Sequence, residues 1–174
     1  MTTTVAQRPP AIAGLSGGKQ TPIATVYPSV SSTALGKALG QLYECLPIKI
    51  FGIKLSYLLF PLPTAIIGVK IFFYLKLFGE VYVLTNRTMQ IRRSIGNRLI
   101  REIPLSDITE VVVKHEPGQE FFSDGDIYLL GKSGQTLMSL PGVGNADVFR
   151  QTILEAQRAR NQVAASLATI SARH

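Results

Sequence analysis

The sequence predicts a mainly β fold that ends in a C-terminal α-helix and is preceded by a helical, membrane-associated hairpin. Three observations lead to this prediction. Residues 47–79 are apolar and carry lysines but no carboxylate, residues 80–140 divide into short segments separated by turn residues, and an apolar stripe with helical spacing follows.

Composition limits the chemistry that the chain can perform. Its 174 residues, 46% apolar and 17% charged, suit one domain with extensions and are more apolar than a typical soluble domain. A single cysteine, Cys45, excludes a disulfide framework and a multi-cysteine metal site, and we expect it to be buried. With only His115 and His174 as imidazoles, we expect no metal, no cofactor and no enzyme activity.

The net charge of +7 is unevenly distributed. Residues 1–79 hold seven basic residues and one acid, whereas residues 80–158 hold nine basic and ten acidic residues. A nucleic-acid binder would place its basic surplus on the folded domain. Because the surplus surrounds the apolar stretch instead, we expect a membrane as partner, and neither nucleic acid nor a small-molecule substrate.

The first two segments precede the apolar stretch. Residues 1–30 are rich in Thr, Pro, Ala and Gly without periodicity, which predicts a flexible arm. Residues 31–46 predict an amphipathic helix with a Ser/Thr N-cap, lying either on a membrane or on protein. Its expected apolar face comprises Leu35, Ala38, Leu39, Leu42 and Leu46.

The apolar segment at residues 47–79 has two prolines at its centre and lysines at mirrored distances on both sides. Its longest uncharged run, residues 55–69, is shorter than the about 20 residues of a straight transmembrane helix. A turn at residues 61–63 would set two apolar arms side by side and return the lysines to one face, since proline disfavours helix before it. We therefore predict a membrane hairpin anchored by Lys49, Lys54, Leu58, Leu59, Phe60, Pro61, Pro63, Ile66, Ile67, Lys70 and Lys76. A kinked single span and a soluble apolar core remain as alternatives.

Residues 80–158 predict a small antiparallel roll closed by a helix. Six segments have strand character, and the "IGN" at residues 95–97 supplies a hairpin turn. The terminal helix begins after Gly144 or Asn145, and its apolar stripe comprises Val148, Phe149, Ile153 and Ala156. Residues 159–174 continue it as a helix extension or a tail.

Three motifs of this region resemble the membrane-associated bacterial pleckstrin-homology (PH) domain family. They are the "YVLTNR" of residues 82–87, the "IPLSDI" of residues 103–108 and the "GVGNA" of residues 142–146. The resemblance implies a PH-like roll of two near-orthogonal antiparallel sheets plus a helix, and no enzyme activity. The prolines and lysines of residues 47–79 depart from the two membrane spans that the family often carries.

Five arginines fall within fifteen residues and without an acid among them: Arg87, Arg92, Arg93, Arg98 and Arg101. By the same resemblance, such basic side chains contact anionic lipid. Alternation along a strand would also turn them outward as a solvated face, and a protein-docking site is the third interpretation. We expect Arg87, Arg92 and Arg98 to share one edge of the domain.

These observations predict a non-enzymatic, membrane-anchored adaptor that presents a binding face at the cytoplasmic side of the bacterial inner membrane. Another membrane protein or self-association would supply the partner. The alternative is an accessory structural subunit of a larger membrane complex, in which residues 31–79 pack on partner helices rather than on lipid.

Overall fold

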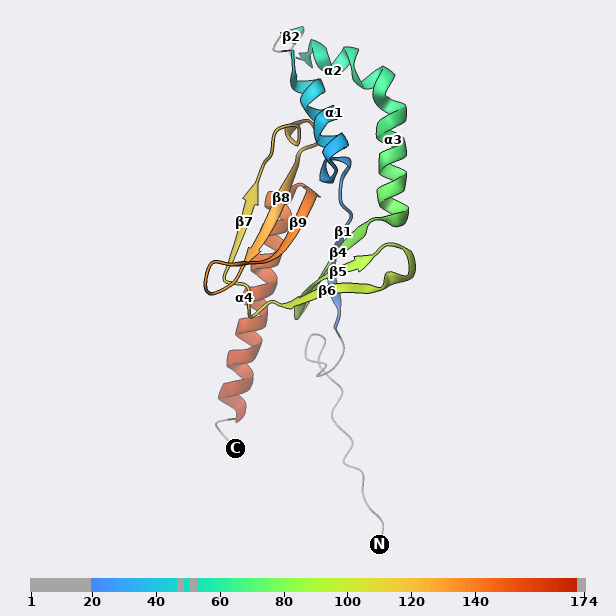
Figure 1. Cartoon of the computed structure of the whole chain (residues 1–174). Coiled ribbons are helices and arrows are strands. Elements are labelled where there is room, and N and C mark those ends of the chain that lie inside the picture. Colours follow the sequence, from blue (N-terminus) through green and yellow to red (C-terminus); the bar gives the residue numbers. More distant parts are fainter. Residues whose placement is uncertain (1–19, 47–48, 51–52, 172–174) are drawn as a thin grey trace.

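The computed structural model describes residues 20–46, 49–50 and 53–171, and two antiparallel sheets form the body of the molecule (Figure 1). The first sheet has the order β1-β4-β5-β6 and the second the order β7-β8-β9. The strands of the first sheet are β1 (Pro22–Val26), β4 (Glu80–Thr85), β5 (Thr88–Arg93) and β6 (Leu99–Pro104). Those of the second are β7 (Glu110–Lys114), β8 (Asp124–Leu130) and β9 (Thr136–Gly144).

The core lies between the two sheets and the helix α4 (Ala146–Ser171). This core forms because side chains alternate between the two faces of a strand. Leu84, Met89 and Ile127 point into the core, and their neighbours in the chain point to the other face of the sheet. Phe149 and Ile153 of α4 are part of this core. Val148 is 67% exposed, so the prediction that it belongs to the buried stripe is wrong. The predicted fold class, a PH-like arrangement of two antiparallel sheets closed by a C-terminal helix, is therefore confirmed.

A helical arch stands on this body and consists of three helices joined by a short two-stranded sheet (Figure 1). We use "helical arch" for residues 34–78. The chain rises along α1 (Ala34–Glu44), passes through β2 (Lys49–Ile50) and β3 (Ile53–Lys54), crosses on α2 (Leu55–Leu59) and returns along α3 (Pro61–Phe78). The arch is thus inserted between two neighbouring strands of one sheet, β1 and β4.

The chain reversal does not lie at the prolines, where the sequence predicted it. Pro61 and Pro63 open α3, because the first N–H groups of a helix have no partner inside the helix and a proline there loses no hydrogen bond. The reversal lies earlier, where Lys49 of β2 pairs with Lys54 of β3 in an antiparallel ladder. These two lysines therefore sit at the far end of the arch, and Lys76 lies near its base, so the four lysines do not share one face.

The predicted flexible arm also needs correction, because its last residues belong to the fold. β1 forms part of the first sheet, and the short 3-10 helix η1 (Val30–Ser32) leads into α1. Periodicity was too weak to reveal β1, which is a strand only because β4 pairs with it. Residues 1–19 lie outside the described residues. At the other end of the chain, the predicted helix extension is present, since α4 continues to Ser171.

Candidate functional site

The side of the arch that faces the domain is made by α1, which packs very closely on the β7–β8 loop. Thr33 caps α1 by accepting a hydrogen bond from the Gly36 N–H at 3.0 Å. A Cβ on Gly40 would lie 1.8 Å from the carbonyl oxygen of Gly118, so only glycine allows this approach. The buried face of α1 is therefore Gly36, Leu39, Gly40 and Tyr43, and the predicted Leu35 is exposed.

Polar contacts reinforce this docked side. The Lys37 ammonium lies 2.6 Å from Glu116 and 3.1 Å from Asp126, and the Phe121 N–H donates to Glu44 at 2.8 Å. Burial lowers the pKa of Lys37, but the hydrogen bonds with Glu116 and Asp126 outweigh it and raise that pKa above its ordinary value. α1 is thus held to the domain by ionised, hydrogen-bonded groups.

Aromatic contacts complete the docked side. The centroid of the Tyr43 ring lies 4.5 Å from that of Phe121 and 6.3 Å from that of Phe122. Both phenylalanines of the loop are half-buried beneath α1. The expectation of a buried Cys45 is wrong, because this residue follows the last turn of α1 and its side chain is exposed.

The opposite side of the arch, α3, contacts the rest of the protein along one narrow stripe. We call it the body-facing stripe: Pro61, Thr64, Gly68, Ile71 and Leu75, which alone on this helix are half-buried. Their spacings of three and four residues place them on one face. Within the stripe, the Thr64 hydroxyl lies 2.6 Å from the Tyr43 hydroxyl, which fixes α3 against α1.

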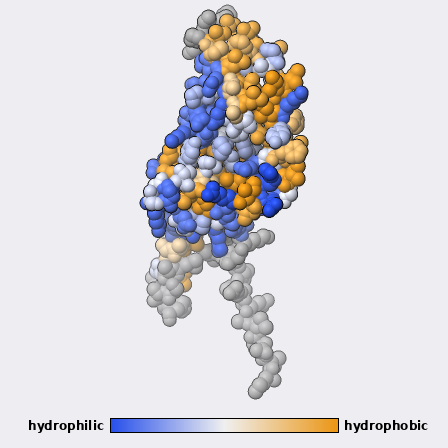
Figure 2. Space-filling view, viewed as in Figure 1, coloured by the Kyte–Doolittle hydropathy of each residue, from blue (hydrophilic) through white to orange (hydrophobic). Residues whose placement is uncertain are grey.

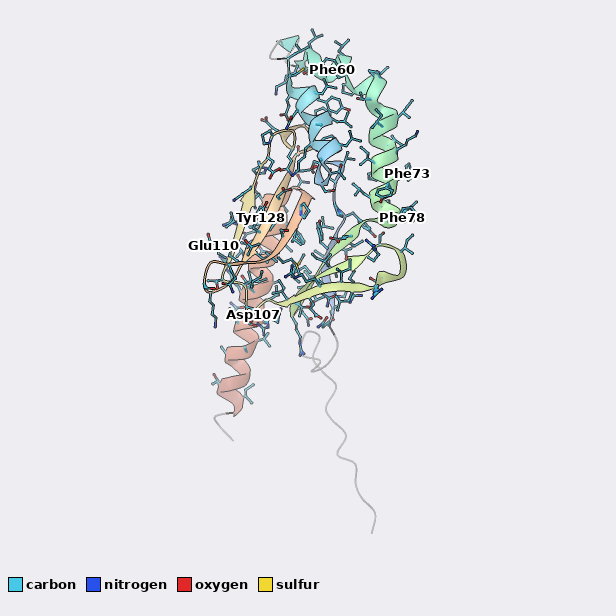
Figure 3. The ribbon with its side chains drawn as sticks, viewed as in Figure 1. Phe60, Phe73, Phe78, Asp107, Glu110 and Tyr128 are labelled. Atoms are coloured by element: carbon cyan, nitrogen blue, oxygen red, sulfur yellow. The ribbon has the colours of Figure 1, made fainter. Side chains whose placement is uncertain are left out.

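The remaining surface of α3 is apolar and exposed, and no side chain of α3 is buried. Figure 2 shows hydrophobic surface over the α2 and α3 side of the arch and mostly hydrophilic surface over its α1 side, and Figure 3 places Phe60 at the bend and Phe73 and Phe78 along α3. We call the face opposite the body-facing stripe the outward stripe: Leu62, Ile66, Val69, Phe73 and Leu77, each more than half exposed.

The other predicted anchor residues take different places. Leu59, Ile67, Lys70 and Lys76 are exposed, whereas Phe60, Pro61 and Lys54 are half-buried. The side chains of Lys49 and Leu58 lie outside the described residues. The structure therefore gathers the predicted anchor residues of α3 on one helix rather than on two arms.

The five arginines do not form one cluster. Arg93 and Arg98 meet at the tip of the β5–β6 hairpin, where the Arg93 N–H donates to the Arg98 carbonyl at 2.8 Å. Arg87 lies in the β4–β5 turn, at the opposite end of β5, so the expectation that it shares an edge with Arg92 and Arg98 is wrong. Arg101 is exposed on β6, opposite Ile91. The arginines can be identified from the sequence, but the direction of the strands that separate them cannot.

Arg92 belongs to a polar network on the outer face of the first sheet. Its Nε donates to the Gln90 side chain at 2.8 Å, and Gln90 donates in turn to Glu102 at 3.0 Å. Hydrogen bonds from Thr88, Gln20 and Gln90 hold the pKa of Glu102 below its ordinary value. Arg92 is therefore hydrogen-bonded within this network, whereas Arg93 and Arg98 are exposed at the tip of the hairpin.

The tip of this hairpin lies against the base of α3. Ser94 donates its hydroxyl to the Lys76 carbonyl and its N–H to the Gly79 carbonyl, the latter at 3.0 Å. A crevice of about 500 Å³ opens between the two elements and is lined by Tyr74, Phe78, Arg93 and Ile95. Basic and aromatic side chains of the domain thus adjoin the apolar surface of α3.

A cavity of about 810 Å³ lies away from this surface, between the end of α1, the β7–β8 loop and the start of α4. Its lining includes Asp124, the first residue of β8. Asp124 is buried and accepts a hydrogen bond from Ser31 at 2.7 Å, and Asp126 accepts from Gln119 and from the Gly142 N–H. Asp124 thus joins η1 to β8, and Asp126 joins β8 to β9 and, through Lys37, to α1, in keeping with a structural role.

The comparisons with known proteins support one family. A family model described as "Bacterial PH domain" matches residues 37–157, which include most of the arch, the strands β4 to β9 and the first part of α4. No curated protein and no solved structure matches the chain.

Proposed function

The chain belongs to the bacterial PH domain family, and from this premise we propose that it is a non-enzymatic module attached to a membrane through α3. The two-sheet domain then presents a binding face for another protein at the membrane surface. We place it at the bacterial inner membrane with the domain in the cytoplasm.

The observation that carries this proposal is the outward stripe of α3. A surface helix of a soluble domain has a polar face toward water, whereas α3 has no polar face and exposes only two isolated charges, Lys70 and Lys76, among apolar residues. Soluble monomers rarely expose a contiguous apolar surface of this kind unless it is a contact site. Hydrocarbon would cover the outward stripe without any complementary protein surface.

The charges around α3 also support attachment to an anionic surface. From Cys45 to Gly79 the sequence contains lysines but no carboxylate. Lys70 and Lys76 lie on α3, and Arg93 and Arg98 lie at the hairpin tip near its base; each basic side chain near an anionic leaflet contributes about 1 kcal/mol. The cytoplasmic leaflet is the anionic one, which sets the proposed orientation.

The alternative function is that of an accessory subunit in a membrane complex, in which partner helices cover α3. One observation favours it: Lys70 is exposed next to the outward stripe, where a carboxylate of a partner helix would pair with it. Native mass measurement of the detergent-extracted protein separates the two functions. A stable hetero-complex supports the subunit, and a monomer or small homo-oligomer supports the adaptor.

A triple substitution tests the attachment. Changing Leu59, Ile66 and Ile67 to Asp introduces three charges, each costing roughly 2.5 to 3.5 kcal/mol at the centre of a bilayer-spanning helix and less near the surface. We expect the variant to move from the membrane fraction to the soluble fraction with an unchanged strand signal in circular dichroism.

A matched control keeps this test specific. Val148, Val163 and Ile170 are exposed aliphatic residues of α4, and changing them to Asp adds the same charge far from α3. This control should stay with the membrane. If both variants partition alike, the proposal fails, and if the α3 variant loses its strand signal, α3 contributes to the folded core instead.

A further inference from the structure

β1 and β4 fasten the two ends of the helical arch to each other. Thr25 pairs with Val83 and Val26 with Tyr82 in the antiparallel ladder, and the Asn86 N–H donates to the Thr21 carbonyl at 3.1 Å. Further along, the Ser29 N–H donates to the Gly142 carbonyl at 2.8 Å, which joins the same segment to β9. The chain before the arch and the chain after it are therefore parts of one folded unit.

This pairing restricts how the arch can meet a bilayer. If β1 and β4 remain paired, residues 20–26 and the domain lie on the same side, and the segment between them crosses the membrane an even number of times. Among the described residues, α3 is the single helix that is long and apolar enough to cross. One crossing would separate β1 from β4, so a single span is incompatible with this sheet.

A second crossing by α1 is incompatible with its contacts. Lys37, Glu44 and the loop residue Glu116 would enter hydrocarbon with α1, because the ion pair and the hydrogen bond to Phe121 tie them together. Charged groups are costly at that depth. The close fit of Gly40 on Gly118 leaves no room for lipid between α1 and the domain.

From these restrictions we infer that the protein attaches to one leaflet from one side, with α3 lying along the membrane surface. This inference deepens the proposed function and rests on it. The body-facing stripe stays against α1 and η1, and the outward stripe enters the acyl chains of the near leaflet. α3, about 27 Å long at about 1.5 Å per residue, provides a long apolar ridge for this contact.

The tip of the β5–β6 hairpin belongs to the same contact surface. The Ser94 bonds fix the tip at the base of α3, and its Ile95 is 56% exposed. Arg93 and Arg98 then lie at the level of the head groups, and Tyr74 at the rim of the crevice is an amphipathic ring suited to that layer. The lipid contact is thus made by two elements distant in sequence.

Fluorescence depth measurement tests this arrangement in the full chain. Single cysteines are placed along the outward stripe at Leu62, Ile66, Phe73 and Leu77 in a Cys45→Ser background and labelled with an environment-sensitive dye. The protein is mixed with vesicles of phosphatidylcholine and phosphatidylglycerol that carry nitroxide quenchers near the head group or near the chain end. We expect a blue shift at all four positions and the same preference for the shallow quencher from one end of α3 to the other.

Two further labels serve as controls. Ile71 is an isoleucine of the body-facing stripe and should be quenched less than Ile66, while Ser133 in the β8–β9 turn should report water. A depth profile that is deepest in the middle of α3 and shallow at both ends would overturn the inference but leave membrane attachment standing. No blue shift at any position would overturn both the inference and the proposed function.

A cross-link between the paired strands provides an independent test. Thr25 and Val83 are directly opposed in the ladder, so Thr25→Cys and Val83→Cys should form a disulfide in the Cys45→Ser background. We expect the oxidised protein to bind the vesicles as well as the reduced protein does. Loss of binding on oxidation, restored by reductant, would show that the strands must separate and would overturn the inference.

Discussion

α3 and α4 are the two longest helices among the described residues, and their apolar side chains lie in opposite environments. α4 has an apolar stripe whose Phe149 and Ile153 are buried in the domain core, and its exposed faces are mostly polar, with a few exposed aliphatic residues such as Val148. α3 has apolar residues on all its faces, interrupted only by Lys70 and Lys76, and no residue outside its body-facing stripe is even half-buried. An amphipathic helix completes a core with one face, whereas an evenly apolar helix requires a second apolar environment that the domain does not provide.

The largest expected effect comes from truncating matched isoleucines in the two helices. Ile153 is 0% exposed and Ile66 is 68% exposed. Ile153→Ala should lower the free energy of unfolding by about 2–5 kcal/mol because it leaves a cavity, and Ile66→Ala should change it by no more than about 0.5 kcal/mol. Urea unfolding followed by circular dichroism measures both values. Equal losses would remove the distinction between the two helices.

Two glycines sharpen the comparison within the arch itself. Gly40→Ala places a Cβ against the backbone of Gly118, whereas a Cβ on Gly68 meets nothing within 4 Å. We expect Gly40→Ala to destabilise the protein by about 1–3 kcal/mol through overpacking. Gly68→Ala should stabilise α3 by up to about 1 kcal/mol, because alanine has the higher helix propensity.

Thermal unfolding of the two glycine variants is the measurement. If Gly40→Ala were neutral, α1 would not be docked as the structure shows. Membrane binding should survive in Gly68→Ala, since its substitution lies on the body-facing stripe and not on the outward stripe.

The smallest effect concerns pH and the buried carboxylate that links η1 to β8. Burial raises the pKa of Asp124 above its ordinary value of 3.8, although hydrogen bonds from Ser29 and Ser31 partly offset this. The folded state then holds the proton more tightly than the unfolded state, so this contribution to stability is present below pH 3.8 and is lost as pH rises through the raised pKa.

Asp124→Asn stays neutral and should not show this loss. As pH rises above 3.8, the free energy of unfolding of the wild type should therefore fall relative to that of the variant. Ser31→Ala removes a hydrogen bond to the carboxylate, so it should raise the pKa of Asp124 further and enlarge the effect. If the difference between the two free energies of unfolding stayed constant across this pH range, the raised pKa of Asp124 would be contradicted.

Much of the domain could be predicted from the sequence because its signals are local. The strands β4 to β9 follow from alternation and turn residues. The hairpin turn at residues 95–97 follows from Gly96 and Asn97, which adopt φ values of 78° and 49°. β1 could not be predicted, since its five residues form a strand only through pairing with β4, some 55 residues later.

The residue types of the candidate site could be predicted from the sequence, but their positions relative to one another could not. Prolines 61 and 63 suit both the tip of a hairpin and the first turn of a helix, and the identity of the residue does not decide between these positions. Arg87 and Arg98 lie close in sequence, but β5 carries them to opposite ends of the sheet. The wide exposed face of α3 depends on how little of it the domain covers, which only the tertiary structure reveals.

The position of the arch between β1 and β4 also sets an order of events during synthesis. β1 leaves the ribosome well before its partner, and at 5–20 residues per second the intervening 53 residues (27–79) take roughly three to ten seconds. Throughout that interval β1 has no neighbour, and α3 is complete before β4 is. Under the proposed attachment, α3 is complete and can contact lipid before the sheet closes, and the pairing of β1 with β4 then closes a protein that is already at the membrane.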